Sequence, residues 1–338
     1  MVQRLLVFAL CTLFIGVFAT WAQDRPGDET IRIETKLVSV PTIVSDHNGR
    51  YIPGLRQADF KVFQDGVEQK VEFFAATEEP INVALLIDTS QSTRPVLDDI
   101  KESAKNFLKL LKPKDKAMVV AFDYDIHTLC PLTADQEQLK AAIKHAEIPP
   151  RGMTGTLLRD AVLDTVGGTF RDLTGRKAII LLTDGKDSGS RTRTPDLLYR
   201  LQETDTLIYS VMFKTGAMQP AMQDRIARVM NRRGGFPPFQ LPPPNDPQRP
   251  GRMQGNNQRA TEFLQQLSEV TAGRFYASND GKLKETFASI VDELRFQYRL
   301  GFYPPEEKDG NLAVHEIKVK VSRPDSAVRA RSSYRSTK

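Results

Sequence analysis

Five side chains with hard oxygen atoms occur in a pattern that could hold a metal ion: Asp88, Ser90, Ser92, Thr156 and Asp184. In an extended loop alternate residues point to the same side, so the first three should converge. Mg²⁺ prefers octahedral oxygen ligation with one or two carboxylates and retained waters. Zn²⁺ would favour His and Cys, and none of the four histidines falls in the pattern. These residue types therefore predict a Mg²⁺ site, which Mn²⁺ or Ca²⁺ would also fit.

The elements around these side chains indicate how they meet. Short, mostly apolar runs, which are typical of strands covered on both faces, lie at 83–87, 118–122, 178–183 and 207–213. Segments with helical apolar spacing separate them. This alternation predicts an α/β fold with a doubly wound, mainly parallel, Rossmann-like sheet. Ligands bind such sheets beyond the carboxyl ends of the strands, where Asp88 and Asp184 fall.

The remaining pattern completes this domain. A helix with an apolar stripe is expected from Leu97 to Leu111, and a further helix should open at Thr194, with Thr194 as N-cap and Pro195 at the first helical position. We also expect an edge strand at 126–132, a strand at 273–277, and helices at 136–145, 157–166, 261–270 and 283–294.

The segments on either side have the period-2 pattern of half-buried strands. This pattern covers residues 31–78 and 298–335, and Asn48-Gly49 and Asp65-Gly66 are strong hairpin turns in the first segment. Two or three strands alone bury little surface and leave open edges. We therefore expect the two flanks to pair into one small β-sandwich-like domain, with the domain at 81–297 inserted between them.

Residues 214–259 interrupt the alternation of strands and helices. They are rich in Pro, Gly, Asn and Arg and cannot bury much apolar surface, so a flexible insertion is expected. The insertion would leave from the sheet edge that carries the metal ligands. It is either a cationic arm that draws in acidic partners or an insertion tolerated at a loop tip.

The first residues have the pattern of a signal peptide. Arg4 precedes an apolar run at 5–18, and small residues lead to Ala22. We expect 1–22 to be a signal peptide cleaved near Ala22, which directs the chain to the periplasm or outside the cell. An uncleaved anchor is the alternative. The mature chain should then have no transmembrane segment and a single cysteine, Cys130, which is expected to be buried.

The charge pattern does not favour nucleic acid as a partner. The chain has 47 basic and 42 acidic residues, a net charge of +5, and the two signs are mixed along most of its length. Asp123 and Asp125 also follow an apolar run, and we interpret them as a solvated turn. His127 is interpreted as a surface residue of the edge strand.

Three motifs together resemble the metal-ion-dependent adhesion site of von Willebrand factor type A (vWA) domains. They are Asp88-x-Ser90-x-Ser92, Gly155-Thr156 and Leu182-Thr183-Asp184-Gly185, and the resemblance extends over residues 81–297. It implies that the five oxygen-bearing residues hold the metal, some of them through water, while a partner's Asp or Glu completes the site. The whole chain is also similar to secreted vWA-related proteins of acidobacteria, through flanking motifs at 59–66 and 297–304.

These features favour a secreted, metal-dependent binding module of the bacterial envelope rather than an enzyme. A metalloenzyme also needs an acid, base or nucleophile placed beside the metal, and Thr89, Gln91 and Lys186 are poor general bases. The alternatives are a metal-dependent phosphoesterase or other hydrolase that uses the same crevice, and a purely structural envelope module. Ser90 or Ser92, taken alone, would more simply cap the following helix.

Overall fold

The computed structural model of the chain describes residues 37–47, 50–76, 79–215, 250–278, 283–305 and 313–335, without the side chains of 250–256. The expected signal peptide and its cleavage near Ala22, the Asn48-Gly49 turn and most of the 214–259 insertion lie outside these residues. None of the helices formed by the described residues is long and apolar enough to cross a membrane.

A six-stranded sheet forms the centre of the α/β part. Its strand order is β10-β9-β8-β5-β6-β7, and all neighbours are parallel except β7, which pairs antiparallel with β6 at one edge. The strands are β5 (Ile81–Asp88), β6 (Lys116–Phe122), β7 (Ile126–Thr133), β8 (Arg176–Thr183), β9 (Leu207–Phe213) and β10 (Arg274–Ser278). This confirms the doubly wound, mainly parallel sheet and its antiparallel edge strand.

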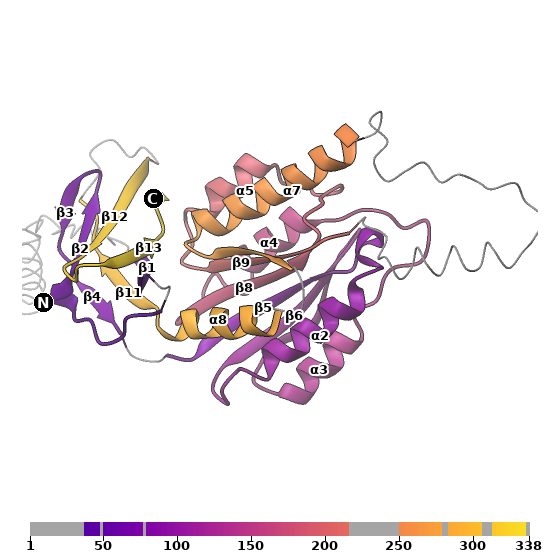
Figure 1. Ribbon diagram of the computed structural model, residues 1–338, viewed down its shortest axis with the longest axis horizontal. Coiled ribbons are helices and arrows are strands. Elements are labelled where there is room, and N and C mark those ends of the chain that lie inside the picture. The colour runs from indigo at the N-terminus through magenta and orange to yellow at the C-terminus, as the bar shows by residue number, and fades with distance from the viewer. Residues whose placement is uncertain are drawn as a thin grey trace, which may run out of the picture. The chain divides into compact units, whose positions relative to one another are not determined.

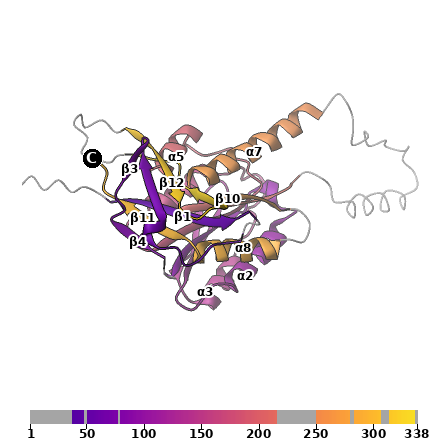
Figure 2. The same cartoon turned by 60° about the vertical axis from the view of Figure 1, so that its left-hand side comes forward.

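Helices cover both faces of this sheet (Figures 1 and 2). One face packs against α2 (Leu97–Leu108), α3 (Gln136–Lys144) and α8 (Leu283–Arg295), and the other against α4 (Leu158–Gly167), α5 (Thr194–Leu201) and α7 (Pro250–Val270). Within β5, Leu85 and Ile87 join the first core, whereas Ala84 and Leu86 join the second. Side chains alternate across a strand, so a strand covered on both faces is apolar throughout.

The two flanks of the chain form a pair of antiparallel sheets, with orders β13-β1-β11-β4 and β14-β12-β2-β3. The strands of the first flank are β1 (Val38–Asp46), β2 (Phe60–Gln64), β3 (Val67–Gln69) and β4 (Phe73–Ala75); those of the second are β11 (Tyr298–Phe302), β12 (Val314–Val321), β13 (Ser326–Ala330) and β14 (Ser333–Arg335). Strands of one flank pair with strands of the other, β1 with β11 and β2 with β12. This confirms the predicted sandwich-like partner of the α/β part.

The boundaries of two helices differ from the prediction. Helix α7 begins at Pro250, so the range 250–259, expected to belong to a flexible insertion, is helical. Gly251, Gly255 and neighbouring asparagines weaken the helical pattern there, but extending a helix is cheaper than nucleating one. Helix α5 has Arg193 as its N-cap, without a side-chain cap bond, in place of Thr194.

A buried glutamate joins the α/β part to the sandwich. Glu293 of α8 is fully buried, and its carboxylate accepts hydrogen bonds from the hydroxyls of Tyr209 on β9 (2.8 Å) and Tyr51 in the first flank (3.0 Å). Arg329 of β13 also donates to this carboxylate, and Arg274 of β10 lies 3.6 Å away. Because Tyr51 and Arg329 come from the two flanks, this cluster ties both flanks to the α/β part.

Candidate metal centre

Asp88 ends β5 and is fully buried. Its Oδ1 accepts a hydrogen bond from the backbone N–H of Ser90 at 2.9 Å, and its Oδ2 accepts one from the hydroxyl of Thr183 at 2.5 Å. The hydroxyl of Thr93 bonds the carbonyl oxygens of Asp88 and Ser90, each at 2.9 Å, which tightens the turn after the strand. The Oγ atoms of Ser90 and Ser92 lie 3.1 Å apart. The expected convergence of this loop is therefore present for its two serines.

Asp184 follows β8, the neighbour of β5 in the sheet. It is buried, and its Oδ2 accepts hydrogen bonds at 2.5 Å from the Lys186 ammonium and from the Thr215 hydroxyl. Thr215 lies just beyond the end of β9, so the chain that leaves β9 passes beside Asp184. This agrees with the expectation that residues after β9 start at the edge of the sheet where Asp184 lies.

The two carboxylates influence each other. Burial, and after it the negative charge of Asp184, raise the pKa of Asp88 to about 7. Burial and a nearby like charge both disfavour the ionised form of a carboxyl group. The hydrogen bonds from Ser90 and Thr183 act in the opposite direction but are outweighed. Asp88 and Asp184 therefore lie close enough to repel each other when both are ionised.

Thr156 is placed by the loop that leads into α4. The first turn of α4 has no cap from its own N-cap residue; instead Asp187 Oδ2 accepts from the N–H of Arg159 (2.9 Å) and Ser190 Oγ from that of Asp160 (3.2 Å). The N–H of Ser188 also donates to the carbonyl of Thr156 at 3.2 Å. Unsatisfied N–H groups at the start of a helix need acceptors, and the loop after Asp184 supplies them for α4. The same loop brings buried Thr156 to this edge of the sheet.

The donor set fits a hard divalent cation. Two carboxylates and three hydroxyl-bearing residues meet at one edge of the sheet, and such oxygen ligands suit Mg²⁺. The Lys186 ammonium forms an ion pair with Asp184, which indicates that this carboxylate attracts a cation. No cluster of three or more His, Cys, Asp or Glu side chains suited to a metal occurs among the described residues, so a metal here would depend on the hydroxyls as well as the two acids.

Several contacts around the centre were not anticipated from the sequence. Thr183 was noted only as part of a motif, yet it holds the Asp88 carboxylate, and Lys186 and Thr215 hold Asp184. The interpretation of Asp123 as part of a solvated turn was wrong: this side chain is 3% exposed and accepts a hydrogen bond from Thr89 at 2.8 Å.

The fold is a doubly wound α/β sheet with two buried acids at the carboxyl ends of neighbouring strands and serine hydroxyls beside one of them. Within this chain, residues 83–186 match the von Willebrand factor type A domain family. The family match therefore assigns a vWA domain to this part of the chain. No curated protein matches the chain.

Three solved structures with similarity to the chain share 12–16% identity with it. Proximal thread matrix protein 1 from the mussel byssus has a TM-score of 0.45 over 67% of this chain, which spans only 48% of that protein. A von Willebrand factor type A protein from Catenulispora acidiphila has a TM-score of 0.46, covering 82% of this chain and 72% of that one. The vWF domain of the type V pili tip protein Mfa5 from Porphyromonas gingivalis has a TM-score of 0.41, covering 64% and 95%.

Proposed function

We propose that this protein is a secreted binding module that engages a carboxylate of a protein partner through a Mg²⁺ ion held by Asp88 and Asp184. The observation that carries the proposal is the meeting of two buried carboxylates at the carboxyl edge of a vWA sheet, with serine hydroxyls beside one of them. A bound divalent ion would offer an open coordination position to a partner's Asp or Glu, as the resemblance to the adhesion site implies.

The chain's own residues divide this task. Asp88 and Asp184 supply two negative charges, which balance those of a divalent ion. Ser90, Ser92 and Thr156 supply neutral oxygens. The carboxylates are held in place by fixed donors, which lowers the entropic cost of assembling the site. Mg²⁺ fits this set well, and Mn²⁺ and Ca²⁺ are the ions to compare with it.

We infer that the site binds rather than catalyses. The polar groups closest to the ligands are already engaged: the Thr89 hydroxyl with Asp123, the Gln91 amide with the carbonyl of Pro149, and the Lys186 ammonium with Asp184. None of these is a free general base of the kind a metal-dependent hydrolase needs.

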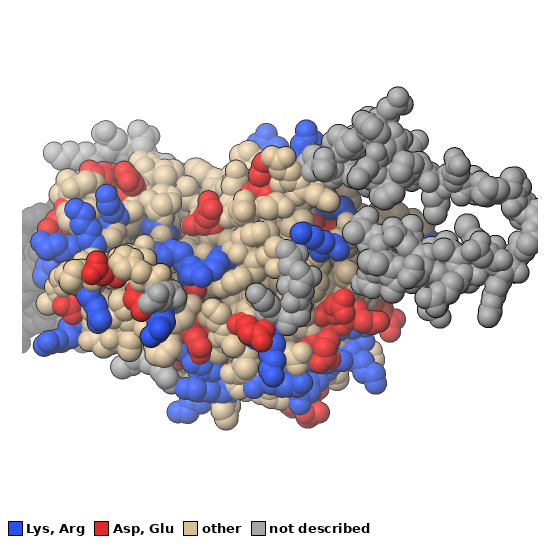
Figure 3. Space-filling model, viewed as in Figure 1, with Lys and Arg blue, Asp and Glu red and all other residues tan. Residues whose placement is uncertain are grey.

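The surface and the N-terminal pattern support an envelope role. Acidic and basic side chains are interspersed on the face drawn in Figure 3, which does not favour nucleic acid as a partner. Secretion to the periplasm or the cell exterior is inferred from the pattern of residues 1–22. The flanking motifs at 59–66 and 297–304, similar to those of acidobacterial secreted proteins, agree with this location.

The proposal is tested by calorimetry with Mg²⁺, Mn²⁺ and Ca²⁺, followed by capture of envelope proteins in Mg²⁺ or in chelator. Asp88→Ala and the isosteric Asp88→Asn should abolish metal binding, and Ser92→Ala should weaken it. Asp172→Ala, which removes an exposed acid elsewhere on the chain, is the matched control. Equal metal affinity in Asp88→Ala and the parent protein would refute the site.

The capture step separates the possible functions. A partner retained in Mg²⁺ and released by chelator, and absent with Asp88→Asn, supports the binding module. Metal-dependent turnover of a generic phosphoester that disappears in Asp88→Ala would instead identify a hydrolase. Metal-linked thermal stabilisation with no retained partner would leave a structural envelope module.

A further inference from the structure

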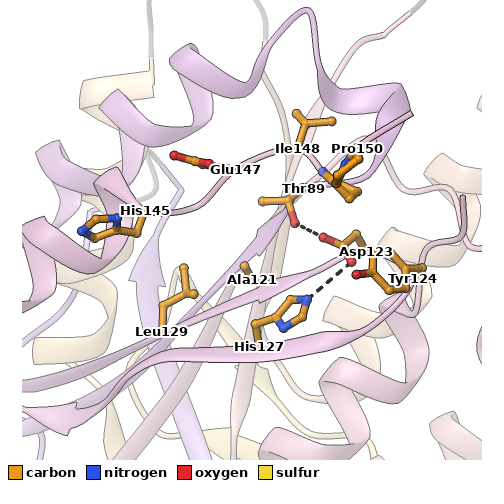
Figure 4. Close-up of a pocket in the computed structure, with 11 residues that line it drawn as sticks. Thr89, Ala121, Asp123, Tyr124, His127, Leu129, His145, Glu147, Ile148 and Pro150 are labelled. Carbon is orange, nitrogen blue, oxygen red and sulfur yellow. Dashed lines mark hydrogen bonds and ion pairs between the residues drawn. The ribbon is translucent and has the colours of Figure 1, made fainter. Parts of the chain in front are cut away.

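A cavity of about 280 Å³ lies beside the metal-ligand loop, between the ends of β6 and β7 and the segment that follows α3. Figure 4 shows Thr89, Asp123 and His127 at one end, and His145 and Glu147 toward the other. Apolar side chains such as Leu129 and Ile148 line the space between them. The cavity is therefore polar at its ends and apolar along its walls.

The charged groups of the cavity are unbalanced. The buried Asp123 carboxylate accepts from the Thr89 hydroxyl (2.8 Å) and from the N–H of Asp125 (3.1 Å), and Nε2 of His127 lies 3.6 Å from its Oδ1. Glu147 adds a second acid at the exposed rim. No Lys or Arg is among the residues that line the cavity. A histidine carries charge only when it is protonated, so none of the residues that line the cavity provides these two acids with a permanent cation.

Two connections join the cavity to the loop that carries the metal ligands. Thr89 stands between Asp88 and Ser90, and its hydroxyl bonds Asp123. On the opposite wall, Nε2 of Gln91 donates to the carbonyl of Pro149 at 2.8 Å. A group bound in the cavity would therefore lie against the same loop that presents Ser90, and one partner segment could reach both places.

We propose that this cavity is a second recognition site, which takes a lysine or arginine side chain of the same partner whose carboxylate binds the metal. The proposal rests on the proposed function and adds a basic residue to what the partner must supply. The ammonium or guanidinium would pair with Asp123, while the methylene stem would lie along Leu129 and Ile148, as long basic side chains do on apolar surface. Two contact points of opposite charge fix the orientation of a partner better than one.

The test uses small probes, since the partner is not identified. Protein-observed NMR measures binding of butylammonium, of butyrate, and of ω-aminocarboxylates of increasing chain length, each with and without Mg²⁺. Butylammonium should shift the resonances of Thr89 and His127 whether or not Mg²⁺ is present. With Mg²⁺, one aminocarboxylate that spans both points should bind at least about tenfold more tightly than the carboxylate of equal length without the amine.

Charge-removing variants identify the site. Asp123→Asn keeps the shape of the side chain. In this variant the aminocarboxylate should bind no more tightly than the carboxylate of equal length, which is the loss of its affinity advantage, while Mg²⁺ and butyrate still bind. Glu147→Gln, at the exposed rim, should reduce the advantage even if Asp123→Asn folds poorly. Glu137→Gln, an exposed acid on α3 that does not line the cavity, is the matched control and should change nothing.

The outcomes are distinct from those of the metal proposal. Failure of Mg²⁺ to bind would overturn the metal proposal and, with it, the shared partner, while butylammonium binding measured without metal would still show whether the cavity takes a cation. Absence of butylammonium binding, or an advantage that survives both Asp123→Asn and Glu147→Gln, would overturn the second site and leave the metal site standing.

Discussion

At the scale of single residues, the centre is organised by the repulsion between two buried acids and by the donors that hold them. Thr183 and the N–H of Ser90 fix the Asp88 carboxylate, and Lys186 and Thr215 fix that of Asp184. Without a divalent ion, two features reduce this repulsion: the raised pKa of Asp88, which favours its protonated form below about pH 7, and the Lys186 ammonium that pairs with Asp184. Both should compete with a metal.

The proton on Asp88 predicts how pH acts on the protein. The pKa of Asp88 is raised from 3.8 to about 7, so at intermediate pH the folded, metal-free protein holds a proton that the unfolded chain has released. By linkage, this contribution to stability is present at low pH and is lost as pH rises toward 7. Mg²⁺ needs the ionised carboxylate, so its affinity should fall roughly tenfold per pH unit below about pH 7.

Calorimetric titrations of Mg²⁺ between about pH 6 and pH 8, with thermal melting in chelator across a wider range, measure both effects. A Mg²⁺ affinity that stays constant across this range would contradict the raised pKa of Asp88.

Removal of the competing ammonium should strengthen metal binding. In Lys186→Ala, Asp184 Oδ2 loses a half-exposed cation, so Mg²⁺ affinity should rise by up to about fivefold, the range of a partly solvated ion pair. Lys140→Ala, which removes an equally half-exposed lysine of α3, controls for the change in net charge. Weaker Mg²⁺ binding in Lys186→Ala would mean that Lys186 positions Asp184 rather than competing for it.

At the scale of elements, loops far apart in the sequence cap and hold one another. The loop after β8 caps the start of α4, and the amide of Gln91 ties the loop after β5 to the segment that precedes Thr156. Gly155 in that segment has φ of +147°, and a Cβ there would lie 3.2 Å from the Cα of Tyr124. A close backbone approach at this glycine therefore helps to place Thr156.

Gly155→Ala should disturb this placement. The strained backbone and the contact with Tyr124 together should cost about 1–3 kcal/mol of stability and weaken Mg²⁺ binding. Gly152→Ala is a matched control in the same loop, since its φ is +101° but its Cβ would meet nothing within 4 Å. Denaturant unfolding and Mg²⁺ calorimetry of both variants separate backbone strain from the contact; if Gly152→Ala impaired Mg²⁺ binding as much, the contact with Tyr124 would not be the cause.

At the scale of the whole molecule, the chain leaves the sandwich to form the α/β part and returns to it. Strands β1 and β11 lie side by side although the α/β part separates them in the sequence, and Arg329 and Tyr51 reach across to Glu293. Cys130 is a free, buried residue within the α/β core. The buried cluster around Glu293 should make the two parts unfold together.

Glu293→Gln should weaken the connection that the Glu293 cluster makes between the α/β part and the sandwich. Removing the acid leaves Arg329 and Arg274 without their buried anion, which should cost about 3 kcal/mol. Glu285→Gln removes an exposed acid from the same helix and should have little effect. Near-UV circular dichroism and proteolysis of each part follow unfolding in parallel. If the two parts of the parent protein already melt at different temperatures, the Glu293 cluster does not couple them.

The sequence by itself determined the strands and helices of both parts, the pairing of the flanks, and the edge of the sheet where Asp88 and Asp184 meet. Apolar periodicity and turn residues are local signals, and the mainly parallel arrangement of the buried strands follows from their alternation with helices. Only the tertiary structure decided that Asp123 is buried, that Thr215 reaches Asp184, and that α7 extends back to Pro250. The first two features depend on contacts between residues distant in the chain, which no local pattern encodes. The third follows from the low cost of extending a helix that has already formed.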